Sequence, residues 1–152
     1  MKFNDAYMLS TESQLIEPNG YFLLQLMNPR ESGKTGYLIG VISSGGCREF
    51  TLTLMEGSMV LAYGKPLIPV PMKEQAQPCS ISSQFFVHKD NPLVGGLVRA
   101  QFRGANGQLN TNLQGLFQVS PGQMMVLYLI NPAKTRAYFD INVAWYEAHS
   151  ME

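Results

Sequence analysis

The feature that most constrains this chain is an alternation of apolar and polar side chains, which recurs in short segments over most of its length. Within residues 137–146, Phe139, Ile141, Val143 and Trp145 fall on one face of an extended backbone. Successive side chains of a β-strand point to opposite faces, so this spacing predicts a half-buried strand. Similar runs predict further strands over residues 21–27, 37–43, 49–55, 59–63, 81–88, 97–103, 116–119 and 124–130.

Turn-forming residues separate these segments, and no window carries the apolar spacing of an α-helix over a helix's length. Short strands with frequent glycine and proline between them are typical of a β-sandwich or barrel. A chain of 152 residues favours one domain. We therefore expect an all-β fold: a single jelly-roll-like antiparallel β-sandwich of about eight or nine strands, over residues 17–152. The predicted turns are Pro18-Asn19-Gly20, Asn28-Pro29, Ser44-Gly45-Gly46, Asn91-Pro92, Gly95-Gly96, Asn106-Gly107, Pro121-Gly122 and Asn131-Pro132.

Four prolines interrupt the strand pattern within residues 64–78. Proline lacks the backbone N–H that a central strand must donate, so Pro66, Pro69 and Pro71 argue against a central strand here. One interpretation is an extended crossover between two sheets, because jelly-roll topologies require such a connection. The other interpretation is a plain exposed loop.

Two apolar segments resemble each other in the order of their residues. Residues 20–29 and residues 122–132 both begin with glycine after a nearby proline, and both end in Asn-Pro. Two hairpins of like construction would suit the opposing sheets of a sandwich. Chance similarity is the competing explanation, so we use this similarity only as support for the topology.

The first sixteen residues differ from the rest, because their apolar side chains are sparse. A disordered terminus is one expectation. The other is an extended N-terminal arm, with Phe3, Tyr7 and Leu9 as contact residues, which adds as a strand to the sheet edge of another copy. Under the second expectation, deleting residues 1–14 abolishes polymerisation and leaves the β-type circular dichroism intact.

The charge of the chain excludes some partners and favours others. Eleven Lys and Arg balance eleven Asp and Glu, and charged residues make up 14% of the chain, against roughly 25% in an average soluble domain. A nucleic-acid binder that neutralises phosphates needs a surplus of Lys and Arg, so nucleic acid is not an expected partner. Weak repulsion between copies favours self-association, so the expected partner is the chain itself.

The two cysteines, Cys47 and Cys79, lie far apart without a CxxC motif or clustered histidines, which argues against a zinc site. They are either buried or idle thiols, or the two candidates for a cross-link, within a subunit or between subunits.

The chain begins without the apolar core of a secretory signal, and no run of 18 apolar residues predicts a membrane span. We therefore expect synthesis in the cytosol and no membrane partner.

Motifs for catalysis are incomplete. Residues 31–35 resemble the end of a phosphate-binding loop, but position 28 is Asn rather than Gly, and a strand pattern follows where the motif needs a helix. His88 and His149 are too few for a metal-dependent cupin site, and no serine lies in a Gly-x-Ser-x-Gly turn. We expect no enzyme activity, no cofactor and no metal. If the chain binds a glycan or a surface, Tyr63 and the loops after Gly64 and Asp90 are the candidate contacts.

Three stretches together resemble small jelly-roll proteins of spore-forming bacteria: residues 18–29, residues 64–78, and residues 119–147 with their closing Trp145-Tyr146-Glu147. The wider resemblance is to self-assembling subunits of endospore appendages and to phage decoration or head-fibre proteins. Appendage subunits carry cysteines in an N-terminal connector, whereas residues 1–16 here have none. The resemblance therefore implies a contact without a covalent link through the arm, or a cross-link at Cys47 or Cys79.

The predicted function is that of a non-catalytic structural subunit, which self-assembles into a fibre or surface layer and has its final place on a spore surface or in an extracellular fibre, in company with a surface-anchoring protein. The alternative is a trimeric or oligomeric binding or decoration module, located on a virion, that recognises a surface or a glycan.

Overall fold

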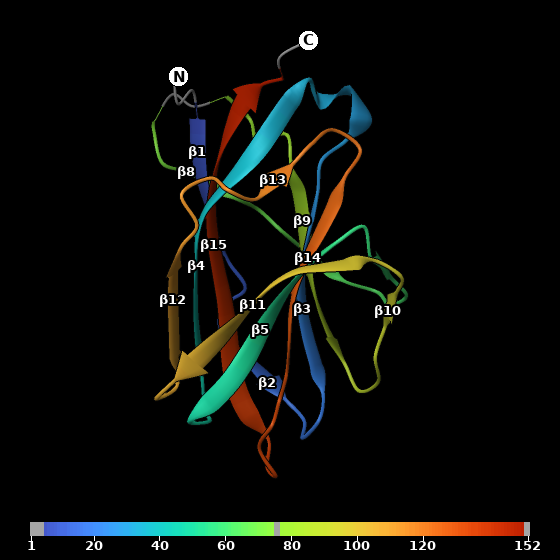
Figure 1. The fold of residues 1–152 in the computed structure, drawn as a ribbon, viewed down its shortest axis with the longest axis vertical. Helices are drawn as coiled ribbons and strands as arrows, with labels where there is room; N and C mark the ends of the chain where they lie inside the picture. Colours follow the sequence, from blue (N-terminus) through green and yellow to red (C-terminus); the bar gives the residue numbers. More distant parts are fainter. Residues whose placement is uncertain (1–4, 75–76, 151–152) are drawn as a thin grey trace.

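A computed structural model of the chain describes residues 5–74 and 77–150. The fold is all-β, with a large antiparallel sheet of 13 strands and a separate sheet of two strands (Figure 1). Its one helical element in the described residues is the short 3-10 turn η1 (Arg30–Ser32), and none of these residues forms a helix of the length and apolar character that a membrane crossing needs. The strands are β1 (Asp5–Ser10), β2 (Gln14–Ile16), β3 (Tyr21–Met27), β4 (Lys34–Gly45), β5 (Glu49–Glu56), β6 (Met59–Val60), β7 (Lys65–Leu67), β8 (Val70–Pro71), β9 (Ser82–His88), β10 (Leu93–Val94), β11 (Leu97–Ala105), β12 (Gln108–Asn112), β13 (Gln118–Val119), β14 (Met124–Ile130) and β15 (Ala137–His149).

The prediction of eight or nine strands is too low. The additional strands are β1, which lies in the expected N-terminal arm, the two- and three-residue strands β2, β7, β8 and β10, and β12, which is rich in polar residues and gives no clear alternation. The predicted strand over residues 37–43 is also too short, because β4 continues to Gly45 and starts at Lys34. The Asn106-Gly107 turn is confirmed: both residues have a positive φ, and they connect β11 to β12.

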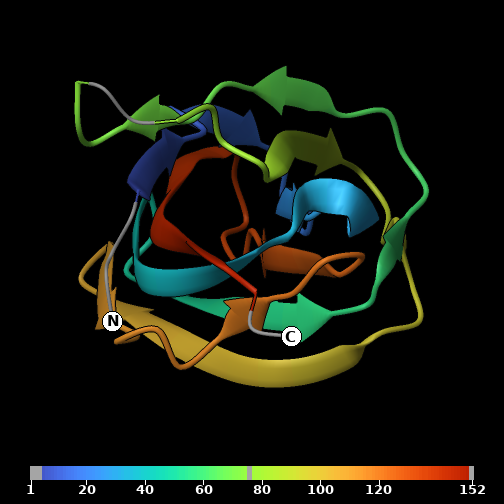
Figure 2. The ribbon, with the colours of Figure 1, turned by 90° about the horizontal axis from the view of Figure 1, so that it is seen from above.

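The large sheet curls around on itself (Figure 2), and its two end strands are not paired with each other. Its order is β7-β9-β3-β14-β5-β11-β12-β4-β15-β1-β8, and only Ile68 and Pro69 separate the end strands β7 and β8 in the chain. The proline-rich segment is therefore an extended connection, but it joins the two ends of one curled sheet rather than two separate sheets. Prolines suit this place because they are tolerated in end strands.

The inside of the curled sheet holds the main hydrophobic core. The predicted face of β15 is confirmed, since Phe139, Ile141, Val143 and Trp145 are all buried. Phe22, Leu24 and Leu26 of β3 face them across the same core. On both sides of the curled sheet, here called its two walls, one face of the strands thus packs against this core.

A second, smaller core lies outside one wall. Leu23, Phe86 and Val126, from β3, β9 and β14, are buried although they point away from the main core. The two-stranded sheet of β6 and β10 covers them, together with the residues beside these strands. We call residues 58–63 and 92–95 the cover sheet. Burial on both faces explains why β3 is apolar at nearly every position instead of alternating.

The two segments that echo each other in sequence are paired neighbours. β3 and β14 are antiparallel, with Tyr21 opposite Ile130, so they do not lie in opposing sheets as predicted. The antiparallel pairing brings each Asn-Pro to the other segment's turn. The Asn131 N–H donates to the Gly20 carbonyl at 3.0 Å, and the Gly122 N–H donates to the Asn28 carbonyl at 2.7 Å.

Residues 5–16 pair within their own chain. β1 pairs with β15 from Asp5 opposite Glu147 to Ser10 opposite Asn142, and β2 pairs with the start of β15. Described residues of the expected N-terminal arm are thus strands of the same sheet. Addition of this segment to another copy would require β1 to leave β15, and it stays a prediction.

Candidate functional site

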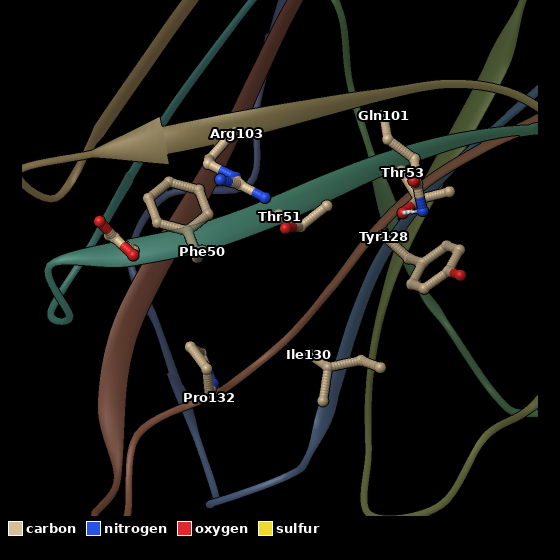
Figure 3. Close-up of a pocket in the computed structure, with 9 residues that line it drawn as sticks. Phe50, Thr51, Thr53, Gln101, Arg103, Tyr128, Ile130 and Pro132 are labelled. Carbon is tan, nitrogen blue, oxygen red and sulfur yellow. Dashed lines mark hydrogen bonds between the residues drawn. The ribbon is translucent and has the colours of Figure 1, made fainter.

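A shallow polar groove of about 540 Å³ lies on the outer face of β14, β5 and β11 (Figure 3). The register places Tyr128, Thr53 and Gln101 in one row across the three strands, and Arg103 opposite Thr51 in the next. The Gln101 Nε2 donates to the Thr53 Oγ1 at 3.4 Å. The groove therefore presents hydroxyl, amide and guanidinium groups beside two aromatic residues, Tyr128 and Phe50.

Such a set of side chains suits binding better than acid–base chemistry. Of the described residues that line the groove, only Glu49 is a carboxylate, and hydrolysis by paired carboxylates needs two. Amide and guanidinium groups give directed hydrogen bonds to a polar ligand, and a tyrosine ring gives it an apolar contact.

A buried carboxylate, Glu147, lies at the end of β15, and its side chain faces the core side of the strand. Four groups donate hydrogen bonds to it. The Trp145 Nε1 and the Cys79 Sγ each lie 3.0 Å from its Oε2, the backbone N–H of Ser80 lies 3.0 Å from its Oε1, and that of Ile81 lies 3.4 Å from its Oε2. Glu147 thereby fastens residues 79–81, which lead into β9, onto β15.

Hydrogen bonding stabilises the charged form of this carboxylate. Burial alone would raise the pKa of Glu147, but the bonds from Trp145, Cys79 and the two backbone amides hold it below its ordinary value. The thiol responds in the opposite direction: burial, and then its hydrogen bond to Glu147, raise the pKa of Cys79. A nucleophilic cysteine needs a lowered pKa, so this pair stabilises the thiol rather than the reactive thiolate.

Tyr7 extends the same cluster on β1. Its ring packs against Trp145 with 6.0 Å between centroids, and its hydroxyl donates to the carbonyl of Gln77. Burial, followed by the charge of Glu147, raises the pKa of the phenol. The cluster thus ties three separate parts of the chain together.

Of the residues named from the sequence, Tyr7 and Cys79 meet in the Glu147 cluster, whereas Cys47 is not part of it. Both cysteines are free thiols: the Cys47 Sγ donates to the Glu49 carbonyl, and the Cys79 Sγ, whose proton faces Glu147, also lies 3.2 Å from the Ile81 carbonyl. Tyr7 and Leu9 are core residues, whereas Phe3 lies outside the described residues. Tyr63 is fully exposed at the end of the first segment of the cover sheet.

The residues of the incomplete catalytic motifs lie in turns and at strand ends. After the left-handed Gly33, β4 begins at Lys34, so a strand and not a helix follows the residues that resemble a phosphate-binding loop. His88 ends β9, where its Nδ1 lies 2.8 Å from the Asp90 carbonyl. Among residues 5–74 and 77–150, no three His, Cys, Asp or Glu side chains are grouped as a metal site would require.

Sequence reasoning missed the Glu147 cluster, although one signal was present. Glu147 continues the series of buried positions from Phe139 to Trp145 at a spacing of two. An acidic residue on the apolar face of a strand predicts a buried carboxylate with hydrogen-bond partners. Its partner Cys79 could not be found in this way, because the two are 68 positions apart.

The bond to Glu147 leads to a testable difference between the two thiols. At pH 8, we expect iodoacetamide to modify Cys79 in the native protein at least about ten times more slowly than Cys47, because the thiolate of Cys79 would lie beside a buried carboxylate. Peptide mass spectrometry of timed samples measures both rates. Equal rates in the native protein would contradict the hydrogen-bonded arrangement, and equal rates in urea serve as the control.

A second groove, of about 630 Å³, lies on the outer face of β1, β15, β4 and β12, and we call it the apolar groove. Gly40 and Ala144 are opposite each other at its floor, where they leave little side chain above the backbone. Met8, Ile42 and Val70 rise around them and are each more than half exposed. Its lining residues carry no charge, and the polar ones are Ser10, Thr111, Asn110, Asn112 and Asn142.

Comparison with known proteins provides no family for this fold and these grooves. No model of a protein family matches the chain, and no curated protein matches it significantly.

Proposed function

We propose that the protein is a non-catalytic structural subunit, a jelly-roll-like sandwich that assembles with copies of itself into a fibre or a surface layer. The observation that carries this proposal is the amount of apolar side chain on its outer surface. Large apolar residues are exposed on two sides of the molecule: Met8 and Ile42 on the outer face of the curled sheet, and Met59 and Leu61 on the cover sheet. Contiguous apolar surface on a soluble protein marks an interaction site.

The composition supports the same function. With a net charge of zero and few charged residues, copies repel one another weakly, so contact between apolar faces meets little electrostatic opposition. The resemblance to endospore-appendage subunits favours a spore surface or an extracellular fibre as the final place of the assembly, with a surface-anchoring protein at its base.

A second function is favoured by the polar groove of Figure 3. In a closed trimer or other small oligomer, this groove would serve to recognise a glycan or another polar surface, as in a phage decoration protein. The two functions differ in the assembly that they require, since a binding module needs a closed oligomer and a structural subunit needs continued growth.

The purified protein is expected to form long assemblies as its concentration is raised from micromolar to millimolar. Size-exclusion chromatography with light scattering gives the mass of the assembly, and negative-stain microscopy gives its shape. A discrete trimer would favour the binding module instead. A protein that stays monomeric throughout this range would refute self-assembly.

A further inference from the structure

The cover sheet is apolar on both of its faces. Val60, Ala62 and Leu93 point inward and pack against the small core of Leu23, Phe86 and Val126. The residues between them point outward: Met59, Leu61 and Val94 are 55%, 62% and 51% exposed, and Tyr63 is fully exposed. Residues 58–63 and 92–95 contain no charged side chain at all. A surface strand normally has polar residues on its outer face, so the outer face of this sheet is built for a contact.

The apolar groove has the matching properties on a concave surface. Its floor is low because Gly40 has no side chain and Ala144 only a methyl group, and apolar side chains flank it. Its polar members are uncharged amides and hydroxyls. An occupant with charged side chains would lose hydration there without gaining a partner charge, so the groove suits an uncharged, apolar surface.

These two surfaces lie on opposite sides of the molecule. The cover sheet packs on the wall formed by β9, β3 and β14, whereas the groove lies on the wall formed by β12, β4, β15 and β1. In Figure 1 β10 is at the right edge and β12 at the left, and Figure 2 shows the same separation from above. A contact between unlike surfaces on opposite sides is heterologous, and it adds further copies instead of closing as a dimer.

We propose that the outer face of the cover sheet of one copy docks into the apolar groove of the next copy, so that subunits join head to tail. The occupant of the groove is therefore a second copy of this chain, with Leu61 and Met59 entering over Gly40 and Ala144. This inference rests on the proposed self-assembly and adds its interface and its polarity. It also gives the outer face of the β4–β15 wall the apolar cover that the opposite wall has within its own chain.

Two single substitutions test the interface, one on each surface. Leu61→Glu places a charge on the cover sheet, and Ile42→Glu places one in the groove; both residues are exposed, so the fold is expected to remain. Each variant alone should be monomeric, with association at least about a hundredfold weaker, because an unpaired charge would be buried in the contact. Leu116→Glu is the matched control. Leu116 is exposed but lies outside both the cover sheet and the apolar groove, so this variant should assemble as the unmodified protein does.

Mixing the two variants gives the decisive readout. The intact cover sheet of Ile42→Glu and the intact groove of Leu61→Glu form one junction, so the equimolar mixture should contain dimers of twice the monomer mass, detected by light scattering, and no longer assemblies. Near-ultraviolet circular dichroism of each variant checks that the fold is unchanged.

Other outcomes would overturn the proposal in distinguishable ways. If Leu61→Glu is monomeric but Ile42→Glu still assembles, the cover sheet has a different partner, such as the cover sheet of another copy. If the mixture remains monomeric, the two surfaces do not contact each other. If both variants assemble like the unmodified protein, self-assembly stands and this interface fails. If the unmodified protein itself stays monomeric, the proposed function fails as well.

Discussion

A Tyr7→Ala/Leu9→Ala double variant is expected to lose at least about 5 kcal/mol of unfolding free energy, which is most or all of the stability of an ordinary domain. Both side chains are almost completely buried, at 1% and 4% exposure, and belong to the main core. Removing them leaves a cavity beside Trp145 and takes the hydroxyl partner away from the Gln77 carbonyl. Urea denaturation followed by the fluorescence of Trp145, the one tryptophan of the chain, measures the loss.

The residue between these two supplies the control. Met8 lies on the same strand but is 53% exposed on the outer face, so Met8→Ala should change the unfolding free energy by less than about 1 kcal/mol. If the double variant were as stable as Met8→Ala, β1 would not be part of the folded subunit in solution. That result would restore the expectation of a free N-terminal arm.

The same structure alters the outcome expected for deleting residues 1–14. The sequence predicted that the shortened chain would keep its β-type circular dichroism. In the structure this deletion removes β1, exposes the edge of β15 from Asn142 to Glu147, and opens the core where Tyr7 and Leu9 lie. We now expect the shortened chain to unfold or to aggregate without order.

Glu147→Gln is expected to lower the unfolding free energy at pH 7 by about 1.5–3 kcal/mol, because hydrogen bonds to a charged acceptor are replaced by weaker bonds to an amide. The amide group also turns two N–H donors toward a site that already holds four. Glu49→Gln is the matched control, since Glu49 is an exposed carboxylate on β5; it should cost less than about 0.5 kcal/mol.

The effect of Glu147→Gln should depend on pH in a defined direction. The pKa of Glu147 is lower in the folded protein than its ordinary value of 4.5, so the carboxylate stabilises the fold above that value. This contribution is lost as the pH falls through the lower, folded pKa. Urea denaturation at pH 7 and at successive values below 4.5 should therefore show the unmodified protein and the variant becoming more alike in stability. A difference that stays constant with pH would contradict a charged Glu147.

The accuracy of the sequence predictions followed the physical origin of each pattern. β3 and β14 were predicted with their observed bounds, because continuous apolar segments there end at Asn-Pro turns. β12 was missed, because its faces mix apolar and polar residues. β1 was expected only as an arm that adds to another copy, and the exposed Met8 hides the burial of its neighbours Tyr7 and Leu9.

The candidate sites were harder to predict than the strands. The rows of the polar groove join side chains of β5, β11 and β14, and their assembly depends on the sheet order, which alternation does not encode. The apolar groove depends equally on placing Gly40 opposite Ala144. The burial of Glu147 could be predicted from its position in β15. Its hydrogen bonds to Cys79 and to the backbone N–H of Ser80 could not, because these residues are 68 and 67 positions away in the chain.

Residues 65–71 carry both end strands of the curled sheet, and their prolines limit how newly made chains can associate. Pro66 and Pro71 lie in the two end strands of the curled sheet, where the missing N–H groups make each strand a poor template for a further one. A chain with so little charge to keep its copies apart is exposed to disordered stacking of strand edges. Once these end strands are in place, copies associate through the outer faces of the sheets, where side chains rather than backbone groups select the neighbour.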